Sequence, residues 1–500
     1  MKDYDVVIVG SGLGGLLCGA ILSKEGYQVC VVEKNKAIGG NLRSFERDGV
    51  IFNTGLHYFG SGDKDQFIYK LFNYLGIYDK LRLRRLDIDR FDIINFKNIE
   101  YPLAQGFENF KEKLLLSFPA EGEAIDNFIS KIRQVGQSNH YFNLQPFDPA
   151  NSQDVFNPLR SVNAHQFINS ITTNDDLRNV MAGLNDLIGG PKEKINMYIL
   201  GMIYYTFIQS AWRFVDGSSQ LAENLAEIIS SSGGMVLTEN RAVEFKLNGN
   251  KEIVSLRTNQ NIEVFGKQFI SNIHPVSTIE LLPPDSLRKV YVDRIKSLEN
   301  SSGMFTLYIV LKPNTFPYLN YNYTCGLTHE MWISRGPNDA WPHSYWFETP
   351  ASSLSRDFAR AVTILSPIGI DMFRKWTDTE TDKRGREYED MKSALAEKLL
   401  SKVYEQFPQL KSSIEKYYCS TPLTQIDYTG SPQGSAYGLI KNSEEPIKSH
   451  VLPNTKIQNL FLTGQNTNAH GMLGVSTGVF LTLAHITDIN SIIKKIKDAD

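Results

Sequence analysis

Apolar and polar positions at the start of the chain follow the order strand, helix, strand. A β-branched run that ends at Gly10 predicts a buried parallel strand, and residues 16–26 have the apolar spacing of a helix that Gly26 ends. A second apolar run, which ends at Glu33, predicts the next strand. The chain therefore opens with a strand–turn–helix–strand unit, which is typical of α/β folds.

The turn between the first strand and the helix has the spacing G-x-G-x-x-G, with Gly10, Gly12 and Gly15. Gly10 permits a tight turn, Gly12 lets the backbone approach a pyrophosphate, and Gly15 allows the helix to pack closely on the strand. Amides at the start of the helix then face the phosphate charge. Glu33 lies at the tip of the second strand, where a carboxylate accepts hydrogen bonds from ribose hydroxyls. The pattern predicts a dinucleotide-binding site.

The same criteria predict helices and strands along the rest of the chain. Helices are predicted over 65–76, 108–118, 218–231, 386–407 and 474–486. Strands are predicted over 235–245, 304–312 and 459–464, with a β-meander over 242–247, 252–257 and 262–270. Helical patterns dominate 61–214, whereas 291–414 mixes strands with helices.

The composition argues against a nucleic acid-binding protein and against a metal site. The 500 residues suffice for two or three domains, and a net charge of −3 gives no electrostatic reason to expect a nucleic acid partner. The four cysteines are far apart, with no C-x-x-C pair and no metal-ligand spacing, so we predict no metal site. Cys18 and Cys30 fall within apolar patterns typical of buried, reduced thiols, which indicates a reducing compartment such as the cytoplasm.

Two apolar segments are candidates for a signal peptide or a membrane-spanning helix. Residues 6–22 follow Asp3 and Asp5 and are interrupted by glycines, which argues against a signal peptide. Residues 195–208 are too few to cross a bilayer, because a spanning helix needs about 20 residues. This second segment is then a buried core helix, the wall of an apolar substrate cavity, or a patch that touches a membrane surface.

A second glycine pair, Gly39-Gly40, follows Glu33 and leads through Arg43 to the sequence FNTGLHYFG at 52–60. This arrangement resembles the FAD-dependent flavoprotein superfamily that contains amine oxidases and phytoene desaturases. TGLHYFG is particularly similar to the branch of carotenoid isomerases and retinol saturases. The resemblance implies an α/β fold in which a discontinuous, Rossmann-like FAD-binding domain carries an inserted, mixed α+β substrate domain. The FAD-binding domain would comprise 1–60, 215–290 and 415–500, and the substrate-binding domain 61–214 and 291–414.

The same resemblance implies which residues hold FAD. The glycine pair and its loop would pass beside the pyrophosphate and reach towards the isoalloxazine, and the backbone near Val243 would contact adenine. A helix predicted to begin at Gly474 would direct its N-terminus at the pyrimidine side of the ring. At position 465 this chain has Gln where many members of the superfamily have an acid. The expected FAD contacts are Gly10, Ser11, Gly12, Leu13, Gly14, Gly15, Glu33, Lys34, Gly39, Gly40, Asn41, Arg43, Thr54, Gly55, Val243, Gly464, Gln465, Gly474 and Val475.

Four side chains in segments expected near the ring are candidates for handling a proton: His57, Tyr58, Tyr437 and His470. Each has a structural alternative. His57 could hydrogen-bond the flavin loop, His470 could fix the turn before the last helix, and both tyrosines could serve in packing. His274 is predicted to be structural.

The leading hypothesis is a FAD-dependent oxidoreductase acting on a carbon–carbon bond of a long apolar substrate, such as a retinoid, carotenoid or other isoprenoid. The sequences TGLHYFG and TGQ (463–465) resemble those of the retinol-saturase-like branch. This resemblance favours reduction of a C=C bond over desaturation or isomerisation. The alternatives are a flavin amine oxidase and a non-catalytic protein that binds flavin and lipid. Because no second G-x-G-x-x-G follows a predicted strand, a diffusible electron donor or acceptor is expected. Peripheral membrane contact is expected with such a substrate, and the sequence leaves the oligomeric state open.

Overall fold

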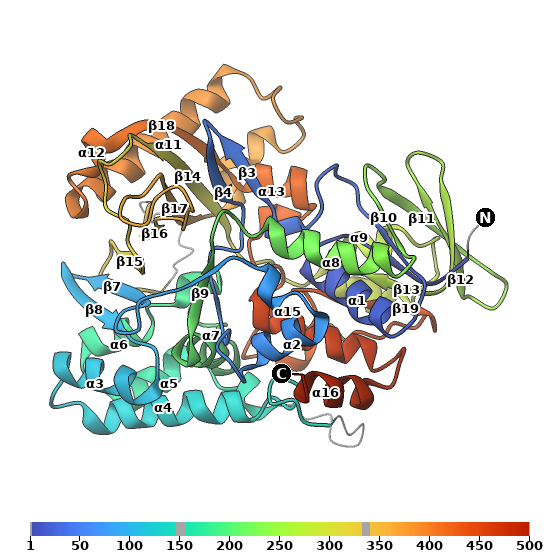
Figure 1. Ribbon diagram of the computed structural model, residues 1–500, viewed down its shortest axis with the longest axis horizontal. Helices are drawn as coiled ribbons and strands as arrows, with labels where there is room; N and C mark the ends of the chain where they lie inside the picture. The colour runs from blue at the N-terminus through green and yellow to red at the C-terminus, as the bar shows by residue number, and fades with distance from the viewer. Residues whose placement is uncertain (1–2, 147–156, 333–340, 500) are drawn as a thin grey trace.

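The computed structural model describes residues 3–146, 157–332 and 341–499. Two seven-stranded sheets form its framework, one on the right and one on the left of Figure 1. Segments from distant parts of the sequence meet in both sheets, so neither sheet belongs to one continuous stretch of chain.

The first sheet combines strands from the beginning, the middle and the end of the chain. Its strands are β1 (Asp3–Val9), β2 (Val29–Val32), β10 (Met235–Leu237), β11 (Ala242–Leu247), β12 (Ile253–Thr258), β13 (Glu263–Ser271) and β19 (Leu460–Leu462). The order is β10–β2–β1–β13–β12–β11, with β19 paired to the end of β13. β10, β2, β1, β13 and β19 run parallel, whereas β11, β12 and β13 form the antiparallel meander that the sequence predicts.

Helices cover this sheet and explain its apolar sequence. They include α1 (Leu13–Lys24), α8 (Ser219–Ser231) and α15 (Gly471–Leu483), and α1 contacts both α8 and α15. Val6 and Ile8 of β1 belong to the core beneath these helices, whereas Val7 and Val9 belong to a second core on the other face. Because β1 is buried on both faces from Val6 onwards, apolar residues occupy every position from Val6 to Val9.

The second sheet is mixed and lies beside the first. Its strands are β7 (Asp92–Phe96), β8 (Ile99–Leu103), β14 (Gly303–Leu311), β15 (Asn322–Gly326), β16 (Ser344–Glu348), β17 (Ala361–Ile368) and β18 (Ile414–Ser420). The order is β18–β14–β17–β16–β15–β7–β8, and only the β15–β7 pair is parallel among the strands that the structure describes.

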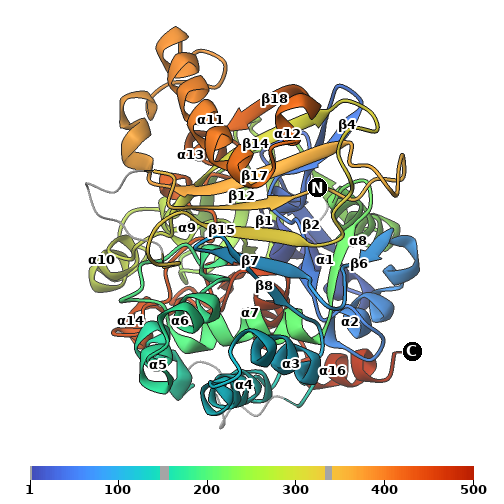
Figure 2. The same ribbon diagram turned by 90° about the vertical axis from the view of Figure 1, so that its left-hand side faces the viewer.

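Two groups of helices cover the two faces of the second sheet. The helices are α3 (Phe107–Ser117), α4 (Gly122–Gln137), α5 (Ala164–Ile171), α6 (Asp175–Met181), α7 (Met197–Gln209) and α11 (Arg386–Gln406). Ile93 of β7 packs in the core with α11, whereas the next residue, Ile94, packs with α3 to α7, as the alternation of a strand requires. Figure 2 shows α11 near β14 and β18, and α3 to α6 near β7 and β8.

Smaller elements join the two sheets. They are β3 (Ser44–Arg47), β4 (Val50–Asn53), β5 (Phe59–Gly60), β6 (Leu83–Arg85), β9 (Ala211–Phe214), α2 (Phe67–Leu75), α9 (Pro275–Glu280), α10 (Lys289–Lys296), α12 (Leu410–Ser413), α13 (Pro422–Thr429), α14 (Pro446–Ser449) and α16 (Ile489–Lys497). β5, β6 and β9 pair in the order β5–β9–β6, and β3 pairs with β4.

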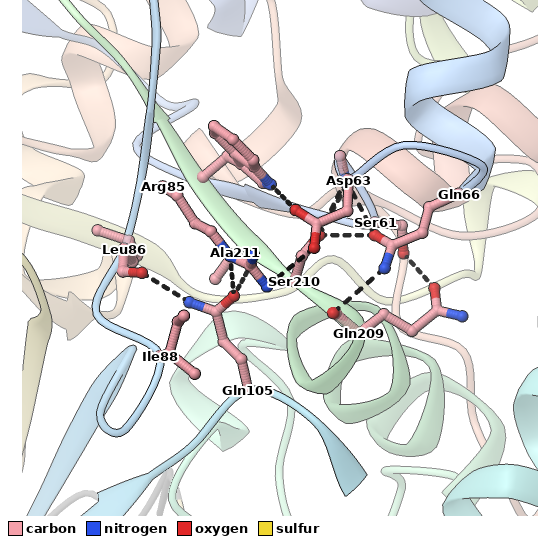
Figure 3. Close-up of polar contacts among 12 residues, drawn as sticks. Ser61, Asp63, Gln66, Arg85, Leu86, Ile88, Gln105, Gln209, Ser210 and Ala211 are labelled. Atoms are coloured by element: carbon pink, nitrogen blue, oxygen red, sulfur yellow. Dashed lines mark hydrogen bonds and ion pairs between the residues drawn. The ribbon is translucent and has the colours of Figure 1, made fainter. Parts of the chain in front are cut away.

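A polar network fixes the segment after β5 against the end of α7 (Figure 3). Asp63 accepts a hydrogen bond from Trp212 Nε1 at 3.0 Å and pairs with Arg85 Nη2 at 2.8 Å. Ser61 donates from its hydroxyl to Gln209 Oε1 at 2.8 Å. These contacts link the segment after β5 to β6 and to the adjacent elements α7 and β9, and they hold β5 beside α7.

The predicted helices are confirmed in α2, α3, α8 and α11, whose ends differ from the prediction by two residues or fewer. The single strand predicted over 235–245 is wrong, because the chain leaves the sheet after β10 and re-enters it at β11. Glu239 has a φ of +58°, and its amide donates to the carbonyl of Asn35. This turn separates the parallel strand from the meander.

Two boundaries also differ from the prediction. The helix expected from Gly474 begins at Gly471, one turn earlier. Residues 415–420, expected in the FAD-binding domain, lie in β18, which pairs with β14 of the second sheet. The side chains of β18 are half-buried apart from the exposed Glu415 and Lys416, as at a sheet edge, and nothing in that local pattern distinguishes one sheet from the other.

Candidate functional site

The predicted phosphate-binding turn lies between β1 and α1. Its glycine positions leave no room for a larger side chain. Gly10 has a φ of +93°. A Cβ atom at Gly15 would lie 2.1 Å from the Gly10 carbonyl oxygen, and one at Gly14 would lie 2.6 Å from Asn272 Oδ1. α1 begins immediately after Gly12, so its first amides precede the intrahelical hydrogen bonds and are available to an anion.

Glu33 joins this turn to the tip of β2. Its buried carboxylate accepts hydrogen bonds from the amide and hydroxyl of Ser11 at 3.0 and 2.6 Å, and from the amide and side chain of Asn35 at 2.8 Å. The Glu33 carbonyl accepts from the amide of Asn240 at 2.8 Å. That bond brings the start of β11, where Val243 occupies a register shift, towards the predicted adenosine end.

The second glycine pair packs directly on the phosphate-binding turn. Gly39 forms an isolated parallel bridge with Gly12, and its amide donates to the Ser11 hydroxyl at 3.1 Å. A Cβ atom at Gly40 would lie 3.2 Å from the Gly12 Cα atom. Side chains at these positions would therefore push the loop away from the turn.

Two cations beside the glycine pair are largely buried. Arg43 donates from Nε to the Gly40 carbonyl at 3.1 Å, and its guanidinium lies 5.2 Å from the centre of the Tyr428 ring. Lys34 donates to the Asp427 carbonyl at 2.8 Å. Burial lowers the pKa of both side chains, with the charge of Glu33 opposing that effect. Both residues therefore supply positive charge where the phosphates are expected.

The loop then turns towards the centre of the molecule. The amide and hydroxyl of Thr54 donate to the Arg43 carbonyl at 3.0 and 2.9 Å. Gly55 packs against Asn41, where a Cβ atom would lie 2.9 Å from the Asn41 Cβ. Asn41 Oδ1 is buried and has no hydrogen-bond partner within the described chain. Asn41, Thr54 and Gly55 all line the central cavity described below.

The C-terminal segment closes the site from the opposite side. Gly464 follows β19 with a φ of +91°, and its Cα atom lies 2.9 Å from the point that a Cβ of Gly14 would occupy. Gln465 follows it and is half-buried. Gly474 and Val475 are buried within the first turns of α15, and Gly474 lines the cavity.

A mostly apolar cavity of about 1370 Å³, measured to its open mouth, lies beside these segments. All four candidates for proton handling line it: His57, Tyr58, Tyr437 and His470. α7 forms one wall, and no residue of α7 is exposed. Of the three interpretations of 195–208, the structure therefore supports the buried helix and the cavity wall.

His57 is held by a buried ion pair that the sequence did not reveal. Its Nδ1 lies 2.8 Å from Glu348 Oε1, and Glu348 Oε2 lies 3.6 Å from Arg213 Nε. Arg213 also donates to the carbonyls of Leu319 and Thr349 at 3.0 and 2.8 Å. His57 Nε2 is buried and has no partner in the part of the chain that the structure describes. Because a carboxylate only accepts, Nδ1 carries the hydrogen of this contact.

Two further candidates, Tyr58 and His470, make contacts of different kinds. Tyr58 stacks between Phe207 and Trp346, with ring centres 4.3 and 5.7 Å away, and burial raises its pKa well above the usual value. His470 precedes α15 and lies 2.8 Å from the Leu187 carbonyl oxygen, so its Nε2 is the donor. Burial lowers the pKa of His470 to about 4, and the ring is neutral at pH 7.

Asp186 is a cavity residue that the sequence analysis missed. It lies in a short 3₁₀ turn, Asn185–Leu187, and accepts a hydrogen bond from the Ser344 hydroxyl at 2.5 Å. Its Oδ1 is buried and has no partner among residues 3–146, 157–332 and 341–499. Burial raises the pKa of Asp186 to about 6. No motif surrounds this residue in the sequence, and only the fold brings it to the cavity.

In the described part of the chain, no helix combines the length and the hydropathy that crossing a membrane requires, and no three His, Cys, Asp or Glu side chains gather as a metal site. Cys18 and Cys30 are buried, as predicted, and neither forms a disulfide within the described residues. His274 begins α9 and accepts from the Val276 amide at 3.3 Å, consistent with a structural role.

The residues present fit a dinucleotide. The glycine cradle, the helix amides, the acid at the tip of β2 and the two buried cations converge within one part of the first sheet. A bulkier cradle would occupy the space that a pyrophosphate needs. The unpartnered Asn41 Oδ1 lies where the loop passes from this cradle to the cavity, and it is available to a bound ring or ribityl chain.

Comparison with known proteins agrees with this geometry. The sequence matches the family described as flavin containing amine oxidoreductase over residues 13–476. An all-trans-retinol 13,14-reductase from Danio rerio is 26% identical, over 95% of this chain and 85% of that protein. A 4,4'-diapophytoene desaturase (4,4'-diaponeurosporene-forming) from Staphylococcus haemolyticus is 22% identical, over 96% of this chain and 97% of that protein.

Among solved structures, a double mutant of putrescine oxidase is similar with a TM-score of 0.65 and 14% identity, over 98% of this chain and 99% of that one. At this identity the similarity shows the fold alone, a Rossmann-like FAD-binding region combined with a substrate region. Since the family match covers nearly the whole chain and the cradle fits its cofactor, this protein belongs to the flavin-containing amine oxidoreductases, as an oxidoreductase with FAD as its cofactor.

Proposed function

We propose that this protein reduces a carbon–carbon double bond of a long, apolar polyene, such as a retinoid or carotenoid. The observation that carries the proposal is the cavity, because its wall is mostly apolar and includes apolar side chains of α7, β17 and α15. The cavity opens beside Asn41, Thr54 and Gly55 of the predicted flavin loop, so a substrate inside it would lie next to the expected position of the flavin ring. The relatives named as a retinol reductase and a diapophytoene desaturase support a substrate of this kind.

Bound FAD, once reduced, supplies a hydride to the substrate. The chain's own contribution is to hold the cofactor through the residues of the cradle and to exclude water with the apolar wall. Glu348 orients His57 through Nδ1, and Nε2, which has no hydrogen-bond partner among the described residues, is left for a hydroxyl group on a substrate. We assign cofactor binding to the first sheet and the cavity cover to the second, with the division after Ser420.

A flavin amine oxidase is the second candidate, because Asp186 could pair with a substrate ammonium group in the cavity. The aromatic arrangement is less favourable to that reaction. Tyr58, Phe207 and Trp346 stack on one another and so do not face each other across a gap that would hold an amine. Electron exchange is proposed to use a diffusible partner.

The flavin spectrum tests the proposal. The purified protein with FAD is reduced by dithionite without oxygen, and all-trans-retinol or a carotenoid is added. The proposed function predicts reoxidation of the flavin in step with loss of polyene absorbance. If no polyene reoxidises the flavin, and an amine such as putrescine instead bleaches the oxidised protein, the amine oxidase assignment replaces it.

A further inference from the structure

One end of the cavity holds a carboxyl group in a fixed position. The 3₁₀ turn Asn185–Leu187 makes two contacts there: the Leu187 carbonyl accepts from His470, and the Asp186 side chain lines the cavity. The Ser344 hydroxyl fixes Asp186 Oδ2 from the second sheet. Asp186 is therefore held relative to the start of α15, which the family fold directs at the cofactor.

This carboxyl group lies among neutral groups. Tyr437 and His470 are the titratable side chains beside it, and their rings are 4.9 Å apart. Burial raises the pKa of Tyr437, with the charge of Asp186 as a second cause, and lowers that of His470 to about 4, so both are neutral at pH 7. The raised pKa of Asp186, about 6, results from burial, which the hydrogen bond from Ser344 partly opposes. An apolar ligand that displaces water from the cavity removes more solvation and favours the protonated acid.

The other candidate groups of the cavity are less well placed to give up a proton. The Nδ1 hydrogen of His57 is directed at the buried carboxylate of Glu348 and away from a substrate. Tyr58 and Tyr437 hold their protons more tightly than ordinary tyrosines, because burial raises the pKa of both. A general acid is most effective when its pKa lies near the working pH. Asp186 meets that condition, and its Oδ1 has no hydrogen-bond partner among the described residues.

We propose that Asp186 is the general acid that gives the substrate its second hydrogen. The Asp186 O–H bond breaks and its proton forms a C–H bond with one carbon of the double bond. The neighbouring carbon receives a hydride, with both electrons, from the reduced cofactor, and the π bond is lost. Asp186 remains as a carboxylate and recovers its proton from water, while a diffusible reductant restores the cofactor. This inference rests on the proposed function.

The number of protons taken up when retinol binds tests whether Asp186 becomes protonated. The measurement needs no catalytic turnover. All-trans-retinol is added to the oxidised holoenzyme in weak buffer at pH 7 with a pH-indicator dye. A rise in the pKa of Asp186 from about 6 by one unit takes up about 0.4 proton, and a rise by two units about 0.8 proton. Asp186→Asn should take up none. Uptake that is the same in Asp186→Asn, or release of a proton on binding, would overturn the inference.

Asp92 provides a matched control. It is also fully buried, accepts from the Thr324 hydroxyl at 3.0 Å, has an unpartnered oxygen within the described chain and has a pKa raised to about 7, but it does not line the cavity. Asp92→Asn should take up protons as the wild type does. In the reduced enzyme, Asp186→Asn should slow retinol-dependent flavin reoxidation about 10²–10⁴-fold, with unchanged retinol affinity, and Asp92→Asn should not.

Ser344→Ala covers the case in which Asp186→Asn fails to bind FAD. Loss of the hydroxyl removes the hydrogen bond that lowers the pKa of Asp186, so the pH at which reoxidation slows should move upwards. An unchanged profile overturns the inference. The outcomes separate the two proposals: if wild-type enzyme reacts with polyenes and both variants react alike, only the general acid is wrong. If a diamine binds with proton release and reduces the flavin, Asp186 is an ammonium counter-ion and the proposed function also fails.

Discussion

Replacing Gly15 by alanine should remove FAD from the protein. The new Cβ atom would lie 2.1 Å from the Gly10 carbonyl oxygen, whereas a carbon–oxygen contact is normally about 3.3 Å or longer. The turn and α1 must then separate by about 1.2 Å, since neither atom belongs to a flexible side chain. A shift of this size misplaces the helix amides relative to the pyrophosphate.

The expected loss follows from those amides. Each hydrogen bond to a charged group contributes about 1.5–3 kcal/mol, so losing two weakens FAD binding by about 3–6 kcal/mol, or about 10²–10⁴-fold. Thermal unfolding is a poor assay for this change. At about 2.1 cal/mol/K per residue, 500 residues have an unfolding entropy of about 1 kcal/mol/K, so 1–3 kcal/mol of overpacking shifts Tm by only about 1–3 °C. The dissociation constant for FAD, titrated by flavin fluorescence, is the decisive quantity.

Gly19→Ala is the matched control in the same helix. Its Cβ atom would meet the Cδ1 atom of Ile229 at 2.7 Å, and this terminal methyl group can rotate away. FAD affinity should stay within about twofold of the wild type, because the gain in helix propensity is about 0.5–1 kcal/mol and the cradle is unaffected. Equal FAD affinity in Gly15→Ala and Gly19→Ala would contradict this account of the cradle.

Three further changes have distinct expected results. Glu348→Ala leaves the buried Arg213 without its carboxylate and should lower the free energy of unfolding by about 3–5 kcal/mol in urea titrations, whereas Glu348→Gln keeps an acceptor for His57 and should cost less; equal midpoints for both would count against the ion pair. Lys441 is buried with a pKa lowered from 10.5 to about 7, so the unfolded chain binds more protons between these values and stability should rise with pH across them. Lys441→Met should flatten that slope, and an unaltered slope would assign it to other groups. Ile203→Trp fills the cavity wall and should weaken retinol binding about tenfold, given an overpacking cost of about 1–3 kcal/mol, with FAD content unchanged.

The cofactor cradle could be predicted because its determinants are local. Gly10, Gly12 and Gly15 lie in one turn, and Glu33 ends the next strand, so a short window of sequence contains both the turn and its acid. The apolar wall was predictable only as one of three alternatives. A buried helix, a cavity wall and a membrane patch have the same composition, and burial alone separates them.

The chemistry of the cavity could not be predicted in the same way. Glu348 reaches His57 from β16, and Asp186 depends on a 3₁₀ turn with no motif. Asn272 fills the space beside the glycines from the end of β13. Each of these residues acquires its role through contacts between distant segments. The early start of α15 was missed for a local reason, because a glycine at 471 looks like loop sequence, yet its φ of +74° lies at the first helical position.

The placement of β19 has a consequence for synthesis in the cell. The strand comes from residues 460–462, yet it pairs with β13 and leads to Gly464, which touches the turn formed by the first residues of the chain. The flavin pocket therefore cannot close until residues 460–464 have left the ribosome. Until then the nascent chain exposes the edge of β13 that β19 covers, and a transiently exposed strand edge makes a chain prone to aggregation.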